Sequence, residues 1–293
     1  MVIVRLLADV AGLRTNIDGL MAALAEAGLP GQARCLAAGP GGLELELAGS
    51  DVARARALVE AHMAAADILI ADHAPRLPQL FVSDMDSTMI GQECIDELAD
   101  FGGLKPEIAA ITERAMQGEL DFEAALRERV ALLAGLGEGA IAQCLAERIR
   151  PMPGARVLVA TLKAQGCRAV LVTGGFHQFA DPVAAMLGFD EVVANRLEVA
   201  DGRLTGGLVG PVCHSGTKRA ALLAGAEALG PGTVTLATGD GANDIPMIEA
   251  ATYGIAYHAK PRARAAANGW IESGDLTAVL HLLGIARANW ASA

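Results

Sequence analysis

The stretch "FVSDMDSTMI", residues 81–90, joins an apolar strand to a cluster of polar side chains. Apolar residues run up to Val82, and two aspartates, Asp84 and Asp86, follow at once with a hydroxyl pair behind them. A buried strand that ends in carboxylates is costly unless a cation lies at its end. Taken alone, the pattern indicates either a divalent-metal site with a nucleophile or an ordinary polar loop.

Three apolar segments predict strands of one parallel sheet. They are "LFVSD" at 80–84, "CRAVLVTGG" at 167–175 and "TVTLATGDG" at 233–241. Continuous apolar strands that alternate with helical segments are typical of a parallel sheet covered by helices on both faces. Such sheets place their sites at the carboxyl ends of the strands. We therefore expect an α/β fold with a Rossmann-like core, and a site where these three segments end.

The rhythm of the sequence divides the chain into two parts. Residues 1–75 follow the order β-α-β-β-α-β of a ferredoxin-like domain, and prolines at 75 and 78 mark a linker. Residues 76–293 form the α/β part, in which about residues 92–150 have a helical pattern throughout. Because a crossover needs only one helix, this insertion predicts a helical cap over the strand ends. We expect residues 1–75 to be separable from catalysis, since they contain no polar strand end.

The composition limits the classes of function. The 293 residues suffice for two domains, and with 53% hydrophobic but only 3% aromatic residues the cores must be aliphatic. Five scattered cysteines argue against a disulfide framework and a structural zinc site. The net charge of −11 disfavours nucleic acid and anionic membranes as partners, and the absence of an apolar span or leader favours a cytoplasmic protein. A small anionic substrate stays compatible, because a bound metal ion reverses the field within one cleft.

The segment "GDGANDIPM" adds Asp240, Asn243 and Asp244 directly after the third strand. An ordinary Gly-Asp turn with a helix cap would account for Asp244, but it leaves Asp240 and Asn243 unexplained. Parallel neighbours would bring these oxygen groups next to Asp84. A site of oxygen ligands without cysteine or histidine favours Mg²⁺ over zinc.

Two further segments contain groups suited to an anion. In "VTGGF" the Thr173 hydroxyl and the amides of Gly174 and Gly175 precede a helix, where backbone N–H groups bind anions. In "SGTKRAAL" Lys218 lies in the first turn of a helix, an unfavourable place for a cation because of the helix dipole. A solvated lysine is the alternative, unless a phosphate binds there.

The ordered set "DMDST", "VTGGF", Lys218 and "GDGAND" resembles the four motifs of the haloacid dehalogenase superfamily of phosphohydrolases. Over roughly residues 79–285 the chain resembles the phosphoserine phosphatases of that superfamily, including the cap patterns "QECIDELA", "RAMQGELDFEAALRERV" and "ANRLEVADGRLTG". The resemblance implies that residues 1–75 are similar to an ACT domain. Thr173 is a departure, because many members have serine at this position.

The resemblance implies a role for each motif residue. Asp84 would be the nucleophile and Asp86 the general acid and base. Mg²⁺ would be held by Asp84, Asp86 and Asp240. Five more residues complete the implied core site. Thr173, Gly174 and Lys218 would hold the phosphoryl group, Asp244 would orient the metal shell, and Asn243 would support both.

The resemblance also implies how the cap selects the substrate O-phosphoserine. Glu93 would bind the ammonium and Arg129 the carboxylate, while Met116 and Phe122 would pack around the ligand. Structural roles are the alternatives: Glu93 could cap a helix, Arg129 could pair with Glu123 or Glu128, and the two apolar residues could be cap core. A bidentate contact between arginine and carboxylate is what would separate amino acids from sugar phosphates.

The implied activity is the Mg²⁺-dependent hydrolysis of O-phospho-L-serine, the last step of serine biosynthesis, through an aspartyl phosphate. One alternative keeps the same core but transfers the phosphoryl group to homoserine or another alcohol. Another is an amino-acid-binding regulator with a vestigial core, although Asp84, Asp86, Lys218 and Asp240 are all present. We expect a small-molecule substrate, no nucleic acid or membrane partner, and a homodimer formed through residues 1–75.

Overall fold

The computed structural model describes residues 1–36, 41–116 and 119–292, with the side chains of residues 10–15 and 116 excepted. It is a mixed α/β structure, as the sequence predicts, and it contains one large sheet. Ten strands form this sheet in the order β2-β3-β1-β4-β12-β11-β10-β5-β6-β7, and β8 pairs with β9 alone. In the described part of the chain no helix is both long and apolar enough to cross a membrane.

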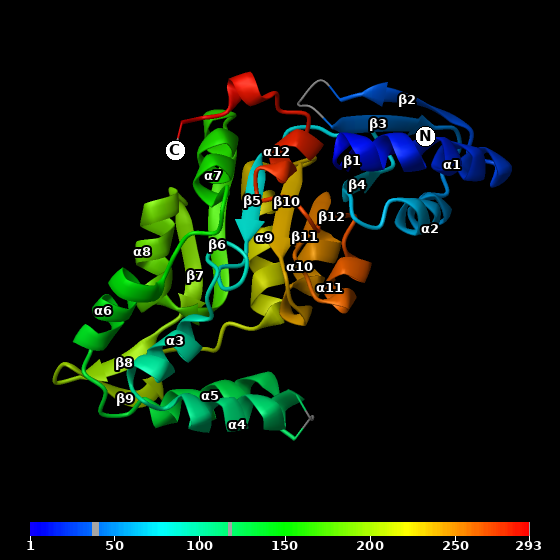
Figure 1. Cartoon of the computed structure of the whole chain (residues 1–293). Coiled ribbons are helices and arrows are strands. Elements are labelled where there is room, and N and C mark those ends of the chain that lie inside the picture. Colours follow the sequence, from blue (N-terminus) through cyan, green and yellow to red (C-terminus); the bar gives the residue numbers. More distant parts are fainter. Residues whose placement is uncertain (37–40, 117–118, 293) are drawn as a thin grey trace.

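The half of the sheet from β12 to β7 is parallel and has β5 near its centre (Figure 1). Strand β5 pairs with β10 on one side and β6 on the other, so that Ser83 lies opposite both Thr238 and Leu171. The strands of this half are β5 (Leu80–Ser83), β6 (Arg168–Phe176), β7 (Glu191–Asn195), β10 (Thr235–Gly239), β11 (Tyr253–Tyr257) and β12 (Gly269–Ile271).

Helices cover both faces of this half, because successive residues of a strand point to opposite faces. Leu80 and Val82 pack in one cluster with Leu222 of α9, whereas Phe81 packs in the main core with Leu158 of α7. The helices of this part are α7 (Ala155–Ala164), α8 (His177–Leu187), α9 (Ser215–Leu229), α10 (Ile245–Ala250), α11 (Pro261–Ala266) and α12 (Ala278–Leu282), with short 3₁₀ turns η1 (Ala242–Asp244) and η2 (Arg287–Asn289).

The inserted block forms a cap at the carboxyl end of the sheet, below it in Figure 1. Its helices are α3 (Cys94–Phe101), α4 (Lys105–Met116), α5 (Phe122–Leu132) and α6 (Gly139–Arg148). A later hairpin, β8 (Leu197–Ala200) and β9 (Arg203–Leu208), joins the cap, since the Gly135 amide donates to the Leu204 carbonyl at 2.8 Å. The cap is therefore assembled from two separate segments of the chain.

The N-terminal part extends the large sheet. Its elements are β1 (Val2–Leu7), α1 (Val10–Glu26), β2 (Gly31–Cys35), β3 (Gly42–Leu47), α2 (Val52–His62) and β4 (Asp67–Ala71). The strand order β2-β3-β1-β4 is antiparallel throughout and agrees with the ferredoxin-like pattern. Strand β4 pairs antiparallel with β12, with Ile68 opposite Trp270. The sequence did not indicate this pairing, which makes one continuous sheet of the two parts.

Candidate active site

The three predicted strand ends meet at one edge of the sheet and line a common cavity of about 490 Å³. Asp84 follows β5, Thr173 and Gly174 lie near the end of β6, and Asp240 follows β10. The cap contributes the opposite wall of this cavity. Of the residues predicted from the sequence, the cavity is lined by Asp84, Asp86, Glu93, Phe122, Arg129, Thr173, Gly174, Asp240 and Asn243.

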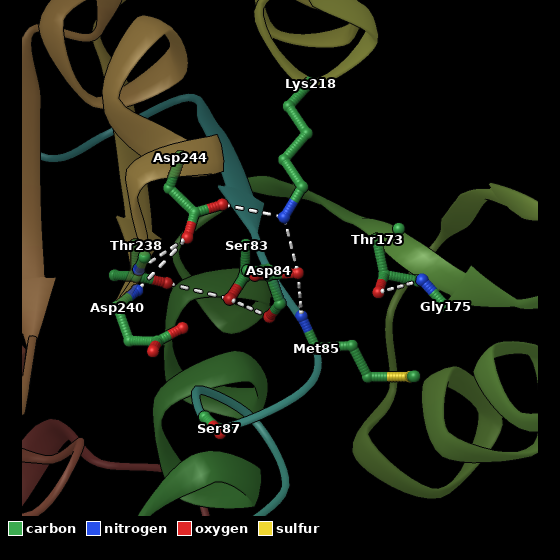
Figure 2. Close-up of polar contacts among 12 residues, drawn as sticks. Ser83, Asp84, Met85, Ser87, Thr173, Gly175, Lys218, Thr238, Asp240 and Asp244 are labelled. Atoms are coloured by element: carbon green, nitrogen blue, oxygen red, sulfur yellow. Dashed lines mark hydrogen bonds and ion pairs between the residues drawn. The ribbon is translucent and has the colours of Figure 1, made fainter. Parts of the chain in front are cut away.

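Lys218 lies behind the cavity wall and binds two carboxylates. Its Nζ is 2.7 Å from Asp84 Oδ1 and 2.7 Å from Asp244 Oδ1 (Figure 2). The Lys218 side chain is 1% exposed, so the alternative of a solvated lysine is wrong. Burial disfavours its charge, yet the two carboxylates raise the pKa of Lys218 above its ordinary value, and it stays protonated.

Asp84 is held rigidly at the end of its strand. Its Oδ1 accepts from the Met85 amide at 2.7 Å as well as from Lys218, and its own amide donates to the Thr238 carbonyl at 3.0 Å. Burial first, then the neighbouring Asp244, raises the pKa of Asp84 well above its ordinary value, and Lys218 opposes this only in part. Further positive charge near Asp84 would favour its ionised form.

Asp86 is a partly exposed residue with one buried, unpaired carboxyl oxygen. Among the described atoms its Oδ1 has no hydrogen-bond partner. Burial, and next the carboxylate of Glu93, raises the pKa of Asp86 to about 7. A carboxyl group that is half protonated near neutral pH and faces a cavity is suited to proton transfer. Ser87 next to it has a φ of 55°, a strained backbone that turns the chain toward the cap.

The loop after β10 is organised by Asp244. Its Oδ2 accepts from the amides of Asp240 at 3.2 Å and Gly241 at 3.0 Å, while Oδ1 accepts from Lys218. A Cβ on Gly239 would lie 2.4 Å from the Asp244 carboxyl carbon, so the close approach requires glycine there. Burial, and next Asp244, raises the pKa of Asp240 to about 6.

The donor set at this edge fits a hard divalent cation. Carboxylate oxygens of Asp84, Asp240 and Asp244 lie within 4.8 Å of one another, and the unpaired oxygen of Asp86 is nearby in the same cavity. Asp244 already accepts one ammonium and two amides, which leaves Asp84 and Asp240 as the better-placed ligands. Oxygen-only ligation and raised carboxyl pKa values both fit a metal ion at this position.

The carboxyl end of β6 is only partly as predicted. The Gly175 amide donates to Thr173 Oγ1 at 2.9 Å, so it is engaged within this segment rather than pointing at a ligand. Asn195 at the end of β7 fixes the same segment, since its Nδ2 donates to the Gly174 carbonyl at 2.7 Å and its Oδ1 accepts from the Cys213 amide at 2.7 Å. Asn195 carries no motif, and sequence reasoning missed it.

Glu93 does not act as the helix cap that the sequence allows. It occupies the N-cap position of α3 without a capping hydrogen bond, and its Oε1 accepts from the Ser87 hydroxyl at 2.8 Å. Its carboxylate lines the cavity next to Asp86.

Arg129 does not form either of the alternative ion pairs. Glu123 pairs with Arg127 and Glu128 pairs with Arg114, both at 2.8 Å. Within the described residues Arg129 has no carboxylate within ion-pair distance, and its Nε donates only to the Ala125 carbonyl at 3.3 Å. Burial lowers the pKa of Arg129, and Asp96 opposes this. A half-buried guanidinium without an ion-pair partner thus lines the cavity.

Of the two apolar residues predicted in the cap, the structure describes the side chain of Phe122 but not that of Met116. Phe122 begins α5, is 42% exposed and packs over Gly174, because a Cβ on that glycine would lie 3.2 Å from the Phe122 ring. Met116 ends α4, and its side chain lies outside the described residues. The cavity also includes Thr112 and Lys260, which sequence reasoning did not single out.

The comparison with known proteins agrees with this architecture. The model of the family described as haloacid dehalogenase-like hydrolase matches residues 81–249. A phosphoserine phosphatase from Albidiferax ferrireducens is 47% identical over 210 residues, covering 70% of this chain and 89% of that protein. Other relatives are longer, and this chain spans 58% and 52% of the length of two of them.

Two solved structures extend the comparison. A probable phosphoserine phosphatase from Vibrio cholerae in unliganded form has a TM-score of 0.78 at 34% identity, covering 98% of this chain and 88% of that one. A phospho-aspartyl intermediate analogue of phosphoserine phosphatase has a TM-score of 0.64 at 39% identity, covering 70% of this chain and 98% of that one. The first of these matches includes the N-terminal part, and the second leaves about a third of the chain unmatched.

Proposed function

Because this chain belongs to the haloacid dehalogenase-like hydrolase family, we propose that it hydrolyses O-phospho-L-serine to L-serine and phosphate. The observation that carries the proposal is the pairing of two half-sites across one cavity. Asp84, Asp86 and Asp240 line the core side, and Glu93 and Arg129 line the cap side. The first half suits a phosphoryl group, and the second suits the ammonium and carboxylate of an amino acid.

In this proposal Asp84 is the nucleophile. Its carboxylate attacks phosphorus and forms an aspartyl phosphate as the bond to the serine oxygen breaks. The salt bridge to Lys218 and the Met85 amide fix the carboxylate in one orientation, which supports an in-line approach. Lys218, the Thr173 hydroxyl and the Gly174 amide hold the phosphoryl oxygens.

Asp86 acts as the general acid and then as the general base. With a pKa of about 7 it carries a proton in a large share of molecules at neutral pH. It donates this proton to the leaving serine oxygen, and it later accepts one from the water that hydrolyses the aspartyl phosphate. The protons balance, because the one that Asp86 donates to the serine oxygen is replaced by the one that it accepts from water.

We propose Mg²⁺ as the metal, held by the carboxylates of Asp84 and Asp240 and the backbone carbonyl of Asp86. When bound, Mg²⁺ neutralises charge between the attacking carboxylate and the phosphate dianion. Asp244 orients this shell, since it binds the Asp240 amide and Lys218 at once. Asn243, which lines the cavity beside Asp240, supports the same region.

The cap gives the specificity. Arg129 has no ion-pair partner among the described residues, which leaves its guanidinium available for the substrate carboxylate. Glu93 accepts hydrogen bonds from the substrate ammonium, and Phe122 covers Gly174 from the cap side. The side chain of Met116 lies outside the described residues, so its contact with the ligand stays a prediction.

One experiment tests the proposal directly. Phosphate release is measured on O-phosphoserine, O-phosphothreonine, glycerol phosphate and p-nitrophenyl phosphate, with Mg²⁺ and after treatment with EDTA. We expect the highest kcat/KM on O-phosphoserine, loss of activity on chelation and recovery with Mg²⁺. Accumulation of a phosphorylated alcohol in place of free phosphate, when homoserine is added, would favour the transferase alternative.

Two further features of the proposal concern the cell and the assembly. We propose a cytoplasmic enzyme that completes serine biosynthesis, because its substrate and product are soluble amino acids. A homodimer through the N-terminal part stays a prediction, which sizing of the full chain by light scattering would test.

A further inference from the structure

Lys260 lines the catalytic cavity from an exposed position, and no motif accounts for it. It follows β11 as the N-cap of α11, and it lines the same cavity as Asp84 and Asp240. Its backbone amide donates to the Asp240 carbonyl at 2.9 Å, which ties α11 to the loop after β10. Its ammonium makes no ion pair in the part of the chain that the structure describes.

The position of Lys260 complements that of Arg129. Arg129 lies on the cap near Asp96 and Glu93. Lys260 lies on the core side, where its charge acts to lower the pKa of Asp240. Four carboxylates line the cavity, namely those of Asp84, Asp86, Glu93 and Asp240. A phosphomonoester dianion that enters such a cavity is repelled until cations balance the field.

The N-terminal part holds the helix that carries Lys260. Arg56 of α2 donates from Nη2 to the Arg264 carbonyl at 2.7 Å and from Nη1 to the Ala267 carbonyl, at the carboxyl end of α11. A cation at this end of a helix is favourable, because the last carbonyls lack partners within the helix. Arg56 also stacks on the Trp270 ring, with 4.8 Å between the guanidinium carbon and the ring centroid.

The two ends of α11 therefore have different partners. At the first end Lys260 contacts the Asp240 loop, and at the other Arg56 binds the carbonyls. The helix has only six residues, Pro261–Ala266, so the two contacts lie close together along the chain. Trp270 is 1% exposed, and the guanidinium carbons of Arg56 and Arg264 lie 4.8 Å and 5.0 Å from its ring centroid.

We propose that Lys260 is a further substrate-binding residue that attracts the phosphate end of the substrate, and that Arg56 positions it from the N-terminal part of the chain. The inference rests on the proposed function in that the substrate is a phosphomonoester. It goes beyond that function because residues 1–75 then contribute to substrate capture. Lys260 acts on phosphate and Arg129 on carboxylate, so the two cations have separable effects.

The test of Lys260 uses two substrates and a matched control. Lys260→Ala should lower kcat/KM about three- to tenfold on both O-phosphoserine and p-nitrophenyl phosphate, mostly through KM, because it removes an attractive charge. Lys260→Arg should keep most of the activity. The control is Arg262→Ala, which removes an exposed charge from the same helix outside the cavity. It should leave kcat/KM unchanged on both substrates.

Salt provides an independent reading of the same variant. The slope of kcat/KM against ionic strength should be more negative for the wild type than for Lys260→Ala, whatever its absolute sign, since screening weakens the attraction that the variant lacks. Equal kcat/KM for Lys260→Ala and Arg262→Ala on both substrates would overturn the role of Lys260. If the wild type releases no phosphate from O-phosphoserine, the proposed substrate fails, and p-nitrophenyl phosphate still tests Lys260.

The test of Arg56 is a double-mutant cycle. Arg56→Ala should lower kcat/KM in the wild-type background and have little effect in the Lys260→Ala background, because the positioned group is already absent. Arg54→Ala, an exposed arginine of the same helix, is the control. Arg56→Lys, which keeps the charge, replaces Arg56→Ala if that variant does not fold. Equal losses of kcat/KM in both backgrounds would show that Arg56 only stabilises the packing of the N-terminal part against α11 and Trp270.

Discussion

The catalytic edge of the sheet and the junction between β4 and β12 use charge in opposite ways. At the catalytic edge, two carboxylates and one ammonium are buried, and Asp86 keeps an oxygen without a partner in the described structure. At the junction, the buried group is the Trp270 ring, and the arginines beside it bind backbone carbonyls or lie over the ring. The first arrangement costs stability and creates a reactive site, whereas the second buries apolar ring area and stabilises the fold, although Trp270 Nε1 has no hydrogen-bond partner among the described atoms.

The largest effect that this comparison predicts is at Asp84. Asp84→Asn should lower phosphate release at least about a thousandfold, because an amide does not form the aspartyl phosphate. The fold should persist, since the core around β5 is apolar and does not depend on the charge. The measurement is phosphate release by the purified variant, with circular dichroism to confirm folding. Turnover close to that of the wild type in a folded variant would remove Asp84 as the nucleophile.

The junction should show its importance in stability rather than in chemistry. A chain that begins at Leu77 uncovers the β12 edge and the Trp270 ring, so we expect a loss of unfolding free energy on the order of 3–5 kcal/mol. The measurement is chemical denaturation of the truncated and full chains. Activity of the truncated chain should be retained in part if it folds. A truncated chain as stable as the full one would show that the junction is only a contact.

These two regions differ in how far the sequence revealed them. The strand ends were predictable, because parallel strands with apolar interiors and acidic ends leave a clear pattern, and Asp84, Thr173 and Asp240 do meet at one edge. The junction was not predictable, because "NGWIES" around Trp270 carries no strand pattern of its own. Pairing of β4 with β12 depends on tertiary packing between segments about 200 residues apart, which local propensity does not encode.

The same contrast appears among single residues of the site. Lys218 was identified by its place in a motif, but its two salt bridges came only from the structure. Asn195 and Lys260 carry no motif, and the fold alone brings them to the loops that they fix. Residues that act through a neighbour's backbone need only a hydrogen-bonding group at the right place, and such groups are common in any sequence.

A smaller effect should separate the two walls of the cavity. Arg129→Ala removes a charge-assisted contact on the order of 1.5–3 kcal/mol, so kcat/KM on O-phosphoserine should fall roughly ten- to a hundredfold. Hydrolysis of p-nitrophenyl phosphate, which lacks a carboxylate, should change far less. Arg127→Ala, an exposed arginine paired with Glu123, is the matched control. Equal losses on both substrates would mean that Arg129 supports the cap instead of binding the ligand.

The smallest predicted effect is on the free energy of unfolding and comes from the catalytic edge. Here a substitution that removes activity should increase stability. The pKa of Asp86 is raised from 3.8 to about 7 by burial, and that of Asp240 is raised to about 6. A group whose pKa is higher in the folded than in the unfolded state stabilises the fold below its ordinary pKa. That contribution is lost as the pH rises through the folded value, here between about pH 4 and pH 7.

Asp86→Asn should therefore inactivate the enzyme and also stabilise its metal-free form at pH 8. We expect a gain on the order of 1 kcal/mol, less than the full pKa shift would give, because a buried amide also loses hydration. The measurement is denaturation of both proteins in EDTA at pH 5 and pH 8. The gain in stability should be smaller at pH 5, where the wild-type carboxyl is mostly protonated. It should also be smaller with Mg²⁺, because the cation stabilises the ionised wild-type carboxylate. A variant that is less stable than the wild type at pH 8 would show that the Asp86 carboxylate stabilises the fold, and the distinction between the catalytic edge and the junction would not hold.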